Sequence, residues 1–384
     1  MSELNASNYL DVAKHMKLIA HHDSAAGVVY WLPAGLRLYE KLKALVRDKH
    51  RALGYQEVRT PNLAGVPLFE QSGHLEKYCE NMFVLDEYVL RPMSCPNHLV
   101  VYQSEVRSYR DLPLALFEFG DVFRNEASGA LQLLFRQRQF CQDDSHVFCA
   151  RDPQSVQDAV VRYLRLAQEV YQSLGLHQMH IAISLRPAKR FGDDAQWDAS
   201  EQALRDACDH LGLPYLEQPG EGAFYGPKIE LGVKDVRGRV WQMGTIQLDD
   251  VLPRRFEAQY IDAQGQAQYP IVLHHAVLGS LERSIGVLLD SYGVNLPAVV
   301  HPYPDVVMAV SDRKHGAYVQ DVVHHLRDLG HEVHEDVQAG TLASKVQYWK
   351  ALGVKHMHVV GDKEMHQYVS PRACALAFVS PSPS

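Results

Sequence analysis

The chain has 384 residues, of which 46% are hydrophobic and 22% charged, with a formal net charge of −8. One hydrophobic core rarely organises a chain this long, so the length predicts two domains. The negative charge argues against a protein that binds nucleic acid with its whole surface, so any RNA contact must depend on local basic patches.

Targeting and redox signals point to an intracellular protein. Apolar runs such as Val306–Val310 are too short to cross a bilayer, and the polar segment Met1–Lys17 does not resemble a signal peptide. The six cysteines lie far apart and form no CxxC pair, which favours reduced cysteines over a disulfide framework. We therefore expect a cytoplasmic protein without a membrane contact.

The first three quarters of the chain mix helix and strand signals. Apolar residues recur at helical spacing over 29–53 and are followed by Gly54, a typical helix stop. Further helices are predicted over 154–174 and 278–289, and strands over 56–60, within 82–92 and 115–123, and over 181–185, 228–233 and 242–248. Clustered strands with few intervening helices predict an α+β domain with an antiparallel sheet flanked by helices.

The last quarter of the chain has a different pattern. After the proline-containing tract 293–304, strands and helices alternate, with strands expected at 306–310, 332–336 and 357–360 and helices at 317–329 and 342–352. Alternation predicts a small α/β domain with a mostly parallel sheet. We place the domains at residues 1–296 and 297–384.

One segment carries a specific signature. Residues 117–149, FEFGDVFRNEASGALQLLFRQRQFCQDDSHVFC, closely resemble the second signature motif of class II aminoacyl-tRNA synthetases in its threonyl version. Other marks of the threonyl branch follow the family's order and spacing, namely GYQEVRTP (54–61), RPMSCPNH (91–98), AFYGPKIE (223–230), WQMGTIQLD (241–249) and HHAVLGSLER (274–283). The resemblance covers about residues 20–365. It implies a class II catalytic domain followed by an anticodon-binding-like domain.

The resemblance implies activation of an amino acid with ATP and Mg²⁺. A carboxylate attacks the α-phosphate of ATP and pyrophosphate leaves, so positioned cations must bring two anions together. Arg124 matches the family arginine that holds the α-phosphate and the threonine carboxylate, and Arg283 matches the arginine on the other side of ATP. The remaining matches to the ATP site are Glu126, Arg136, Phe140 and Gln242.

Three residues match the zinc ligands of the family: Cys95, His146 and His274. Spacing alone is a weak signal in a chain with 21 histidines, and an isolated Cys95 would be interpreted as a small buried hydrophobe. One sulfur and two imidazoles leave a coordination position open, which in this family binds the amino and hydroxyl groups of threonine. His275 is the neighbouring alternative, and the register of PIVLHHAVLGS favours His274.

Further matches form the amino-acid pocket and the transfer site. Asp144 is expected to receive the amino group of the substrate, and the other matches to the pocket are Gln142, Tyr225, Gln247 and Ser280. His74 matches a family histidine near the 3′-terminal ribose of tRNA, where a neutral imidazole suits proton relay. The alternative for His74 is an ordinary histidine of a surface loop.

The sequence also departs from the family. It leaves no room for the N-terminal editing region, so we expect a truncated form that activates some serine. The positions at which relatives read the anticodon hold Ala309, Gln338 and Gly340. Residues 297–384 contain 8 Lys/Arg and 9 Asp/Glu, a net charge of −1 that suits RNA phosphates poorly, so anticodon reading is in doubt.

Three functions remain open at this stage. The first is activation of threonine, or a close analogue, and its transfer to tRNA by a homodimer whose interface forms near Val29–Pro61. The second keeps the activation but transfers the product to a carrier protein or a small molecule, or to a tRNA whose anticodon is not read. The third is a catalytically silent binding protein, against which the presence of Arg124, Arg283 and the zinc triad argues.

Overall fold

The computed structural model describes residues 8–234, 238–303, 305–368 and 370–379. The chain forms two compact units. The larger unit contains His21–Tyr30 and Leu42–Ser291, and the smaller contains the segment that ends at Ala20, Trp31–Lys41 and the chain from Tyr292 onwards. Within the described ranges, no helix is both long enough and apolar enough to span a membrane.

An eight-stranded sheet forms the centre of the larger unit, in the order β11-β10-β12-β13-β16-β9-β8-β3. The six inner strands pair antiparallel, and only the edge strands β3 and β11 pair parallel to their neighbours. The strands are β3 (Gln56–Glu57), β8 (Leu114–Phe123), β9 (Gln139–Cys149), β10 (Met179–Ser184), β11 (Leu216–Gln218), β12 (Lys228–Lys234), β13 (Val240–Asp249) and β16 (Ile271–Ser280). This arrangement confirms the predicted α+β class with an antiparallel sheet.

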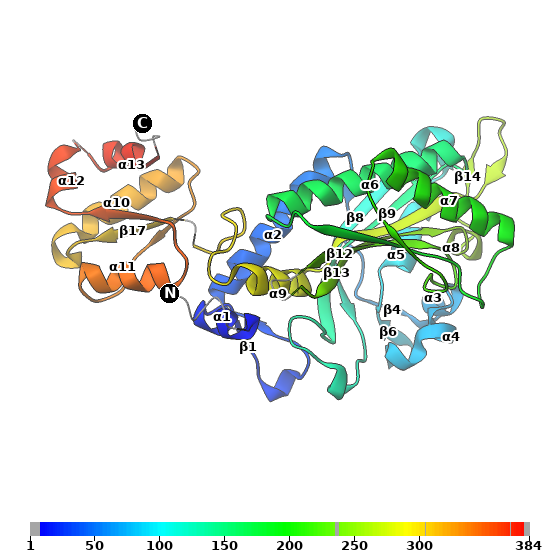
Figure 1. The fold of residues 1–384 in the computed structure, drawn as a ribbon, viewed down its shortest axis with the longest axis horizontal. Helices are drawn as coiled ribbons and strands as arrows, with labels where there is room; N and C mark the ends of the chain where they lie inside the picture. The colour runs from blue at the N-terminus through cyan, green and yellow to red at the C-terminus, as the bar shows by residue number, and fades with distance from the viewer. Residues whose placement is uncertain (1–7, 235–237, 304, 369, 380–384) are drawn as a thin grey trace. The chain divides into compact units, whose positions relative to one another are not determined.

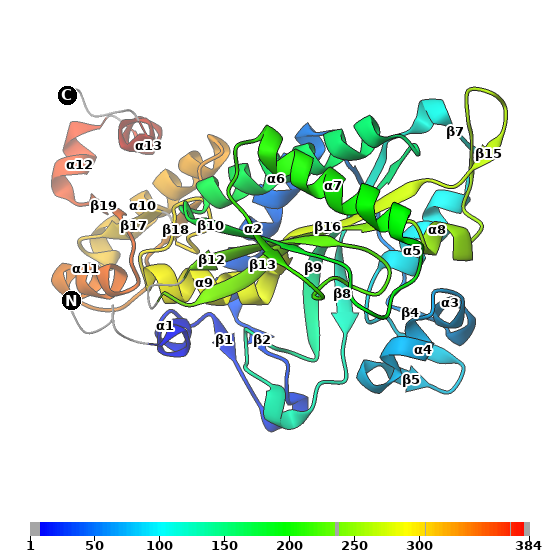
Figure 2. The same ribbon diagram turned by 45° about the vertical axis from the view of Figure 1, so that its right-hand side comes forward.

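Two helices cover one face of this sheet, as Figures 1 and 2 both show: α6 (Pro153–Ser173) and α7 (Asp194–His210). Asp152 caps the start of α6, and the buried stripe Val156–Val160–Leu164 faces inward at helical spacing. The second half of α2 (Pro33–Ala52) packs on the same face, where the His50 ring stacks on Phe117.

The opposite face carries the polar side chains. Because side chains alternate along a strand, His146 of β9 and its register partners Leu116 and His274 point to the same face. The helix α5 (Cys95–Gln103) packs against part of this face through Leu99 and Tyr102, in a core shared with strands β8, β9 and β16. The sheet therefore presents one face to helices and the other to the candidate site.

Smaller elements complete the larger unit. A three-stranded sheet has the order β4-β6-β5, and a second one has the order β15-β14-β7. The elements are β4 (Leu63–Gly65), α3 (Val66–Gln71), α4 (His74–Tyr78), β5 (Phe83–Leu85), β6 (Tyr88–Leu90), β7 (Arg107–Ser108), α8 (Leu252–Arg255), β14 (Tyr260–Ile261), β15 (Ala267–Gln268) and α9 (Leu281–Tyr292), whose last residue belongs to the smaller unit.

The smaller unit contains a three-stranded parallel sheet in the order β18-β17-β19. Figure 1 shows α10 and α13 on one side of this sheet and α11 on the other. The predicted small α/β domain is thereby confirmed. Its elements are α1 (Tyr9–His15), β1 (Ile19–Ala20), β17 (Asp305–Ala309), α10 (Asp312–Asp328), β18 (Val333–Glu335), α11 (Leu342–Ala351), β19 (His356–Val360), α12 (Asp362–Gln367) and α13 (Pro371–Val379), while β2 (Tyr30–Trp31) has one residue in each unit.

Several element boundaries were predicted wrongly. The helix expected from residue 29 begins at Pro33, because residues 30–31 pair with β1 as strand β2. The helix expected from residue 278 begins at Leu281, because β16 continues to Ser280, whose hydroxyl accepts the N–H of Arg283 in the first helical turn. The helix expected from residue 317 begins at Asp312. Helices α5 and α7 were not predicted.

Candidate active site

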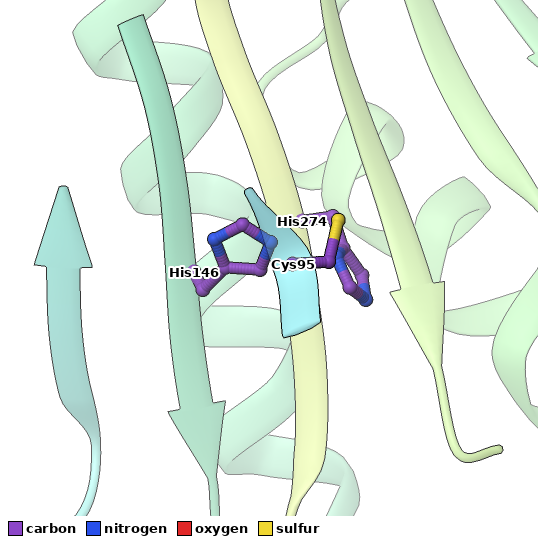
Figure 3. Close-up of side chains that lie close together, drawn as sticks. All are labelled: Cys95, His146 and His274. Carbon is purple, nitrogen blue, oxygen red and sulfur yellow. The ribbon is translucent and has the colours of Figure 1, made fainter. Parts of the chain in front are cut away.

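Three side chains from three different elements meet on the polar face of the large sheet. Cys95 begins α5, while His146 and His274 are register partners on β9 and β16. Figure 3 shows the thiol and the two rings pointing toward one another. Their ligand atoms all lie within 4.8 Å of one another, and all three residues are buried. His275, the alternative to His274 in the sequence, points to the opposite face. Its Nε2 lies 2.9 Å from the Tyr55 hydroxyl, within hydrogen-bond distance.

Each histidine of this cluster has one ring nitrogen held by the protein. Nε2 of His274 lies 2.8 Å from Oδ2 of Asp249, and Nδ1 of His146 lies 2.7 Å from Nδ1 of His98. The other nitrogens, Nδ1 of His274 and Nε2 of His146, are buried and have no hydrogen-bond partner among the described residues. A buried nitrogen without a partner is costly unless it binds something, and a metal ion satisfies both atoms.

The electrostatics of the cluster favour a cation. Burial lowers the pKa of His146 well below its usual value, so its ring is neutral and able to coordinate a metal. Burial would also lower the pKa of His274, but the charges of Cys95 and Asp249 outweigh burial and raise it to about 10. One thiol and two imidazoles form a donor set that suits a divalent transition metal such as Zn²⁺ with an open coordination position.

Three arginines, Arg124, Arg136 and Arg283, lie close enough to one another for their charges to interact. The Arg124 guanidinium lies 5.0 Å from the centre of the Phe140 ring, and Nε of Arg283 donates to the Phe135 carbonyl at 3.2 Å. Burial lowers the pKa of Arg283, and the nearby charges of Arg124 and Arg136 lower it further. Like charges gathered in a partly buried place are unfavourable by themselves and favour a bound polyanion.

The other residues assigned to ATP surround these arginines. Glu126 forms an ion pair of 3.0 Å with Arg136, so two side chains of the predicted ATP site contact each other. The Gln242 side chain donates to Glu230 at 2.9 Å and to Thr245 at 3.0 Å. The backbone carbonyl of Gln242 accepts from Arg283. Contacts and charge effects therefore link the residues of the predicted ATP set to one another.

The residues assigned to the amino acid lie near the Cys–His–His cluster. Gln247 is the register partner of His274 on β13, and its amide donates to the Gly226 carbonyl at 3.1 Å. The Tyr225 ring lies 6.2 Å from the His274 ring. Asp144 and Gln142 precede His146 at alternate positions of β9 and share its face, while Ser280 is the register partner of Gln142. Burial raises the pKa of Asp144.

His74 lines a small cavity of about 60 Å³ together with Tyr225, Met93 and Arg255. Its Nδ1 contacts the Ser72 hydroxyl at 2.7 Å, and its Nε2 contacts the Met93 sulfur at 3.3 Å. Burial, with smaller effects from nearby charges, lowers its pKa to about 4. His74 is thus a neutral, partly buried side chain and not an ordinary surface histidine.

Comparison with known proteins agrees with this geometry. The family described as the tRNA synthetase class II core domain (G, H, P, S and T) matches residues 80–292, and the anticodon binding domain matches residues 305–372. A solved structure described as the RNA binding domain of threonyl-tRNA synthetase from Cryptosporidium parvum is 37% identical, with a TM-score of 0.89 over 94% of this chain and 91% of that one. The chain belongs to the threonyl-tRNA synthetase family.

Other family members give the extent of the similarity. The threonine–tRNA ligase of Alkalilimnicola ehrlichii is 40% identical over 369 residues, which is 95% of this chain and 57% of that relative. A putative threonyl-tRNA synthetase of Aeropyrum pernix is 28% identical with a TM-score of 0.85, covering 97% of this chain and 94% of that one. The chain thus spans little more than half the length of the curated bacterial relative.

In this threonyl-tRNA synthetase family member, the residues that support the candidate ligands were not predicted from the sequence. Asp249 accepts from His274, and His98 contacts His146. Glu118 lies 3.3 Å from His98 and forms a buried ion pair with Arg91 at 2.8 Å. His98 could have been predicted to lie near the cluster, because it follows Cys95 by three residues on a helix. No comparable local signal marked Asp249 or Glu118, because sheet register brings them into place.

Proposed function

We propose that this chain activates threonine with ATP and Mg²⁺ and transfers the threonyl group to the 3′ end of tRNA. One observation carries the proposal: Arg124 lies over the Phe140 ring, which shares a face of β9 with His146 of the Cys–His–His cluster, and Arg283 lies close enough to Arg124 for their charges to interact. The set of arginines fits a nucleotide phosphate, and the set of Cys–His–His ligands fits an amino acid with a hydroxyl group. A reaction that joins these two substrates needs both sets side by side.

In the activation step the threonine carboxylate attacks the α-phosphorus of ATP, the bond to the bridging oxygen breaks, and pyrophosphate leaves. Arg124 would hold the α-phosphate and the carboxylate, and Arg283 would neutralise charge on the other side of the phosphate. Phe140 would stack on adenine, with Arg124 already over its ring at 5.0 Å. Arg136 would exchange Glu126 for the γ-phosphate, leaving Glu126 to receive the adenine.

Selection of threonine is proposed to depend on a zinc ion held by Cys95, His146 and His274. When bound, the ion supplies coordination of the amino and hydroxyl groups of the substrate. Asp144, Gln142, Tyr225, Gln247 and Ser280 would hold the rest of the amino acid. A site that requires a polar group rejects valine by about 10⁴-fold or more, whereas a hydrophobic pocket gains only about 1–3 kcal/mol from one methyl group.

The transfer step is proposed to involve His74. The 3′-terminal ribose hydroxyl attacks the carbonyl carbon of the adenylate, AMP leaves, and the hydroxyl proton needs an acceptor. The low pKa of His74 keeps its ring neutral at pH 7, so it is able to relay that proton. Its position in a cavity with Tyr225 supports this role.

A direct test uses zinc-loaded protein with ATP, labelled threonine and total tRNA. Label on threonine tRNA is the expected result. Formation of threonyl-adenylate without labelled RNA would contradict the tRNA acceptor, and absence of threonine-dependent ATP–pyrophosphate exchange would contradict the activation itself.

A second acceptor has one observation in its favour. Ala309, at a position where relatives read the anticodon, is only 2% exposed and cannot contact RNA. Lys345, near the same sheet edge, is neutralised by Asp312 at 2.6 Å and Asp336 at 2.9 Å. We therefore propose that any tRNA is charged with little dependence on its anticodon, and a carrier protein or small molecule remains the alternative acceptor. Charging of threonine tRNA transcripts with altered anticodons separates these outcomes.

We also propose a cytoplasmic homodimer. The edge strand β3, within the interface predicted at Val29–Pro61, pairs only with β8 among the described strands. The neighbouring sheet of β4, β6 and β5 exposes Leu63, Leu85 and Tyr88 by 46%, 52% and 51%. Their register places these side chains on one face, a feature typical of an interface. Light scattering that shows a monomer for the wild-type chain would contradict the dimer.

A further inference from the structure

We infer that His98 is a positioning residue for the metal site: it fixes the tautomer and ring orientation of His146, so that Nε2 of His146 faces the ion. The inference rests on the zinc site proposed above. His98 is fully buried, and its Nδ1 lies 2.7 Å from Nδ1 of His146. The two rings meet nearly edge to face, at an interplanar angle of 76°.

The contact defines where the protons lie once a metal is bound. A neutral imidazole has one N–H, and a coordinating nitrogen has none. If Nε2 of His146 binds the ion, the proton of that ring is on Nδ1, and His98 must accept it with its own Nδ1. The proton of neutral His98 is then on Nε2, which lies 3.3 Å from Oε1 of Glu118.

Glu118 is held as an anion at the end of this chain. Burial alone would raise its pKa, but His98, Arg91 and Thr60 outweigh burial and lower it to about 2. Arg91 contributes an ion pair at 2.8 Å, and Thr60 donates through its N–H at 3.0 Å and its hydroxyl at 2.7 Å. The carboxylate is therefore fixed from several sides and gives His98 a rigid anchor.

The local structure ties this support to the thiol ligand. Cys95 and His98 are three residues apart on α5, so both side chains project from the same side of one helical turn. One turn thus provides a ligand and also the support for a second ligand that lies on β9. The two histidines of the cluster differ in this respect, because Asp249 supports His274 directly whereas Glu118 supports His146 through His98.

A purely structural pair of buried histidines does not explain the geometry equally well. In such a pair both rings would use their nitrogens within the core, since buried polar atoms are nearly always hydrogen-bonded. Here Nε2 of neither ring makes a hydrogen bond within the described part of the chain, but Nε2 of His98 lies 3.3 Å from the Glu118 carboxylate, whereas Nε2 of His146 lies on the side of Cys95 and His274. The pairing with His98 orients this nitrogen toward the cluster.

The test compares two variants for zinc affinity, measured by chelator competition on metal-stripped and reconstituted protein. His98→Gln keeps an acceptor for His146 and a donor for Glu118, whereas His98→Leu keeps only the volume. We expect zinc affinity to fall by about 10–100-fold in His98→Leu and to stay near the wild-type value in His98→Gln. The absorption bands of bound Co²⁺ should change in His98→Leu, because the orientation of one ligand is lost.

Controls separate positioning from folding. His50→Leu removes another fully buried histidine, from the opposite face of the sheet, and should not change zinc affinity. If His98→Leu does not fold, His98→Asn replaces it, since its shorter amide cannot span both partners and should also weaken zinc binding.

Equal zinc affinity in wild type, His98→Gln and His98→Leu would overturn the inference, as would equal weakening in both variants. If Cys95→Ser does not weaken zinc binding, the metal is held elsewhere and the proposed zinc site falls as well. The zinc measurement does not depend on catalysis, so the inference would survive a failure of threonine activation.

Discussion

The polar face of the large sheet and the carboxyl edge of the small sheet differ in whether their polar and charged groups have partners within the protein. On the large sheet, His146 and His274 keep buried nitrogens without partners among the described residues. Elsewhere in the same unit, the like charges of Arg124, Arg136 and Arg283 interact with one another. On the small sheet, Lys345 lies between Asp312 and Asp336, and Asp362 contacts Lys314 and His315. The first arrangement leaves polar groups available to a ligand, whereas in the second each of these charged groups has an ion-pair partner within the fold.

Among changes on the polar face of the large sheet, Cys95→Ala is expected to cause the largest loss of activity. It removes the sulfur ligand, so bound zinc should fall far below one equivalent and threonine-dependent ATP–pyrophosphate exchange should disappear. Cys149→Ala, which removes another buried thiol, should keep both. Metal analysis and exchange assays check this, and retained exchange in Cys95→Ala would refute the metal assignment.

Lys345→Met tests the small sheet, where the charged groups are paired with one another. The Lys345 side chain is 1% exposed and Asp336 is completely buried, so the substitution leaves a buried carboxylate without its cation. We expect a loss of about 3–5 kcal/mol in the unfolding free energy of the smaller unit, with threonine activation unchanged. Denaturation can be followed by the fluorescence of Trp349, whose indole donates to Asp336.

The matched control for this prediction is Lys314→Met, which removes the cation of an exposed pair with Asp362. Exposed pairs contribute little, so its denaturation curve should match that of the wild type. Similar behaviour of the two variants would show that Lys345 is not stabilising the fold.

Arg124→Ala should lower the rate of threonine activation by about 10²–10³-fold, the usual cost of removing one group that stabilises transition-state charge. Folding should be unaffected, since among the described residues the Arg124 side chain makes only a 3.4 Å contact with the Pro92 carbonyl and a ring contact with Phe140. Arg165→Ala, on the exposed side of α6, is the control. A near-normal exchange rate in Arg124→Ala would remove it from the mechanism.

The smallest expected effect is discrimination against serine. Serine keeps the hydroxyl that the metal would bind and lacks only a methyl group, so the pocket should prefer threonine by about 10–200-fold. Valine should be rejected much more strongly. Steady-state exchange with the three amino acids checks the order, and a preference over serine beyond about 10⁴-fold would contradict the pocket described here.

Much of the molecule was predictable where the signal is local. The periodicity of 154–174 predicted α6 to within one residue at each end, and the alternation of β and α segments after residue 304 predicted the small parallel sheet. The cluster of Cys95, His146 and His274 was predictable only through the resemblance, because sheet register joins residues that are distant in sequence. The limits assigned to the domains stay a prediction.

The rest depends on tertiary contacts that no local pattern encodes. Helix α5 was missed because Pro96 and Asn97 near its start obscure the apolar face formed by Leu99 and Tyr102. Asp249 and Glu118 were missed because their roles follow from neighbours across the sheet. His98 was within reach, since it follows a proposed ligand by three residues on a helix, yet its contact with His146 needed the fold.

Zinc-dependent activation of threonine is tested most directly by threonine-dependent ATP–pyrophosphate exchange, measured on the zinc-loaded chain and on the same protein stripped of metal. We predict robust exchange with zinc, loss of exchange on stripping, and recovery on adding zinc back. Absence of exchange with threonine in protein that carries one zinc at Cys95, His146 and His274 would contradict the account.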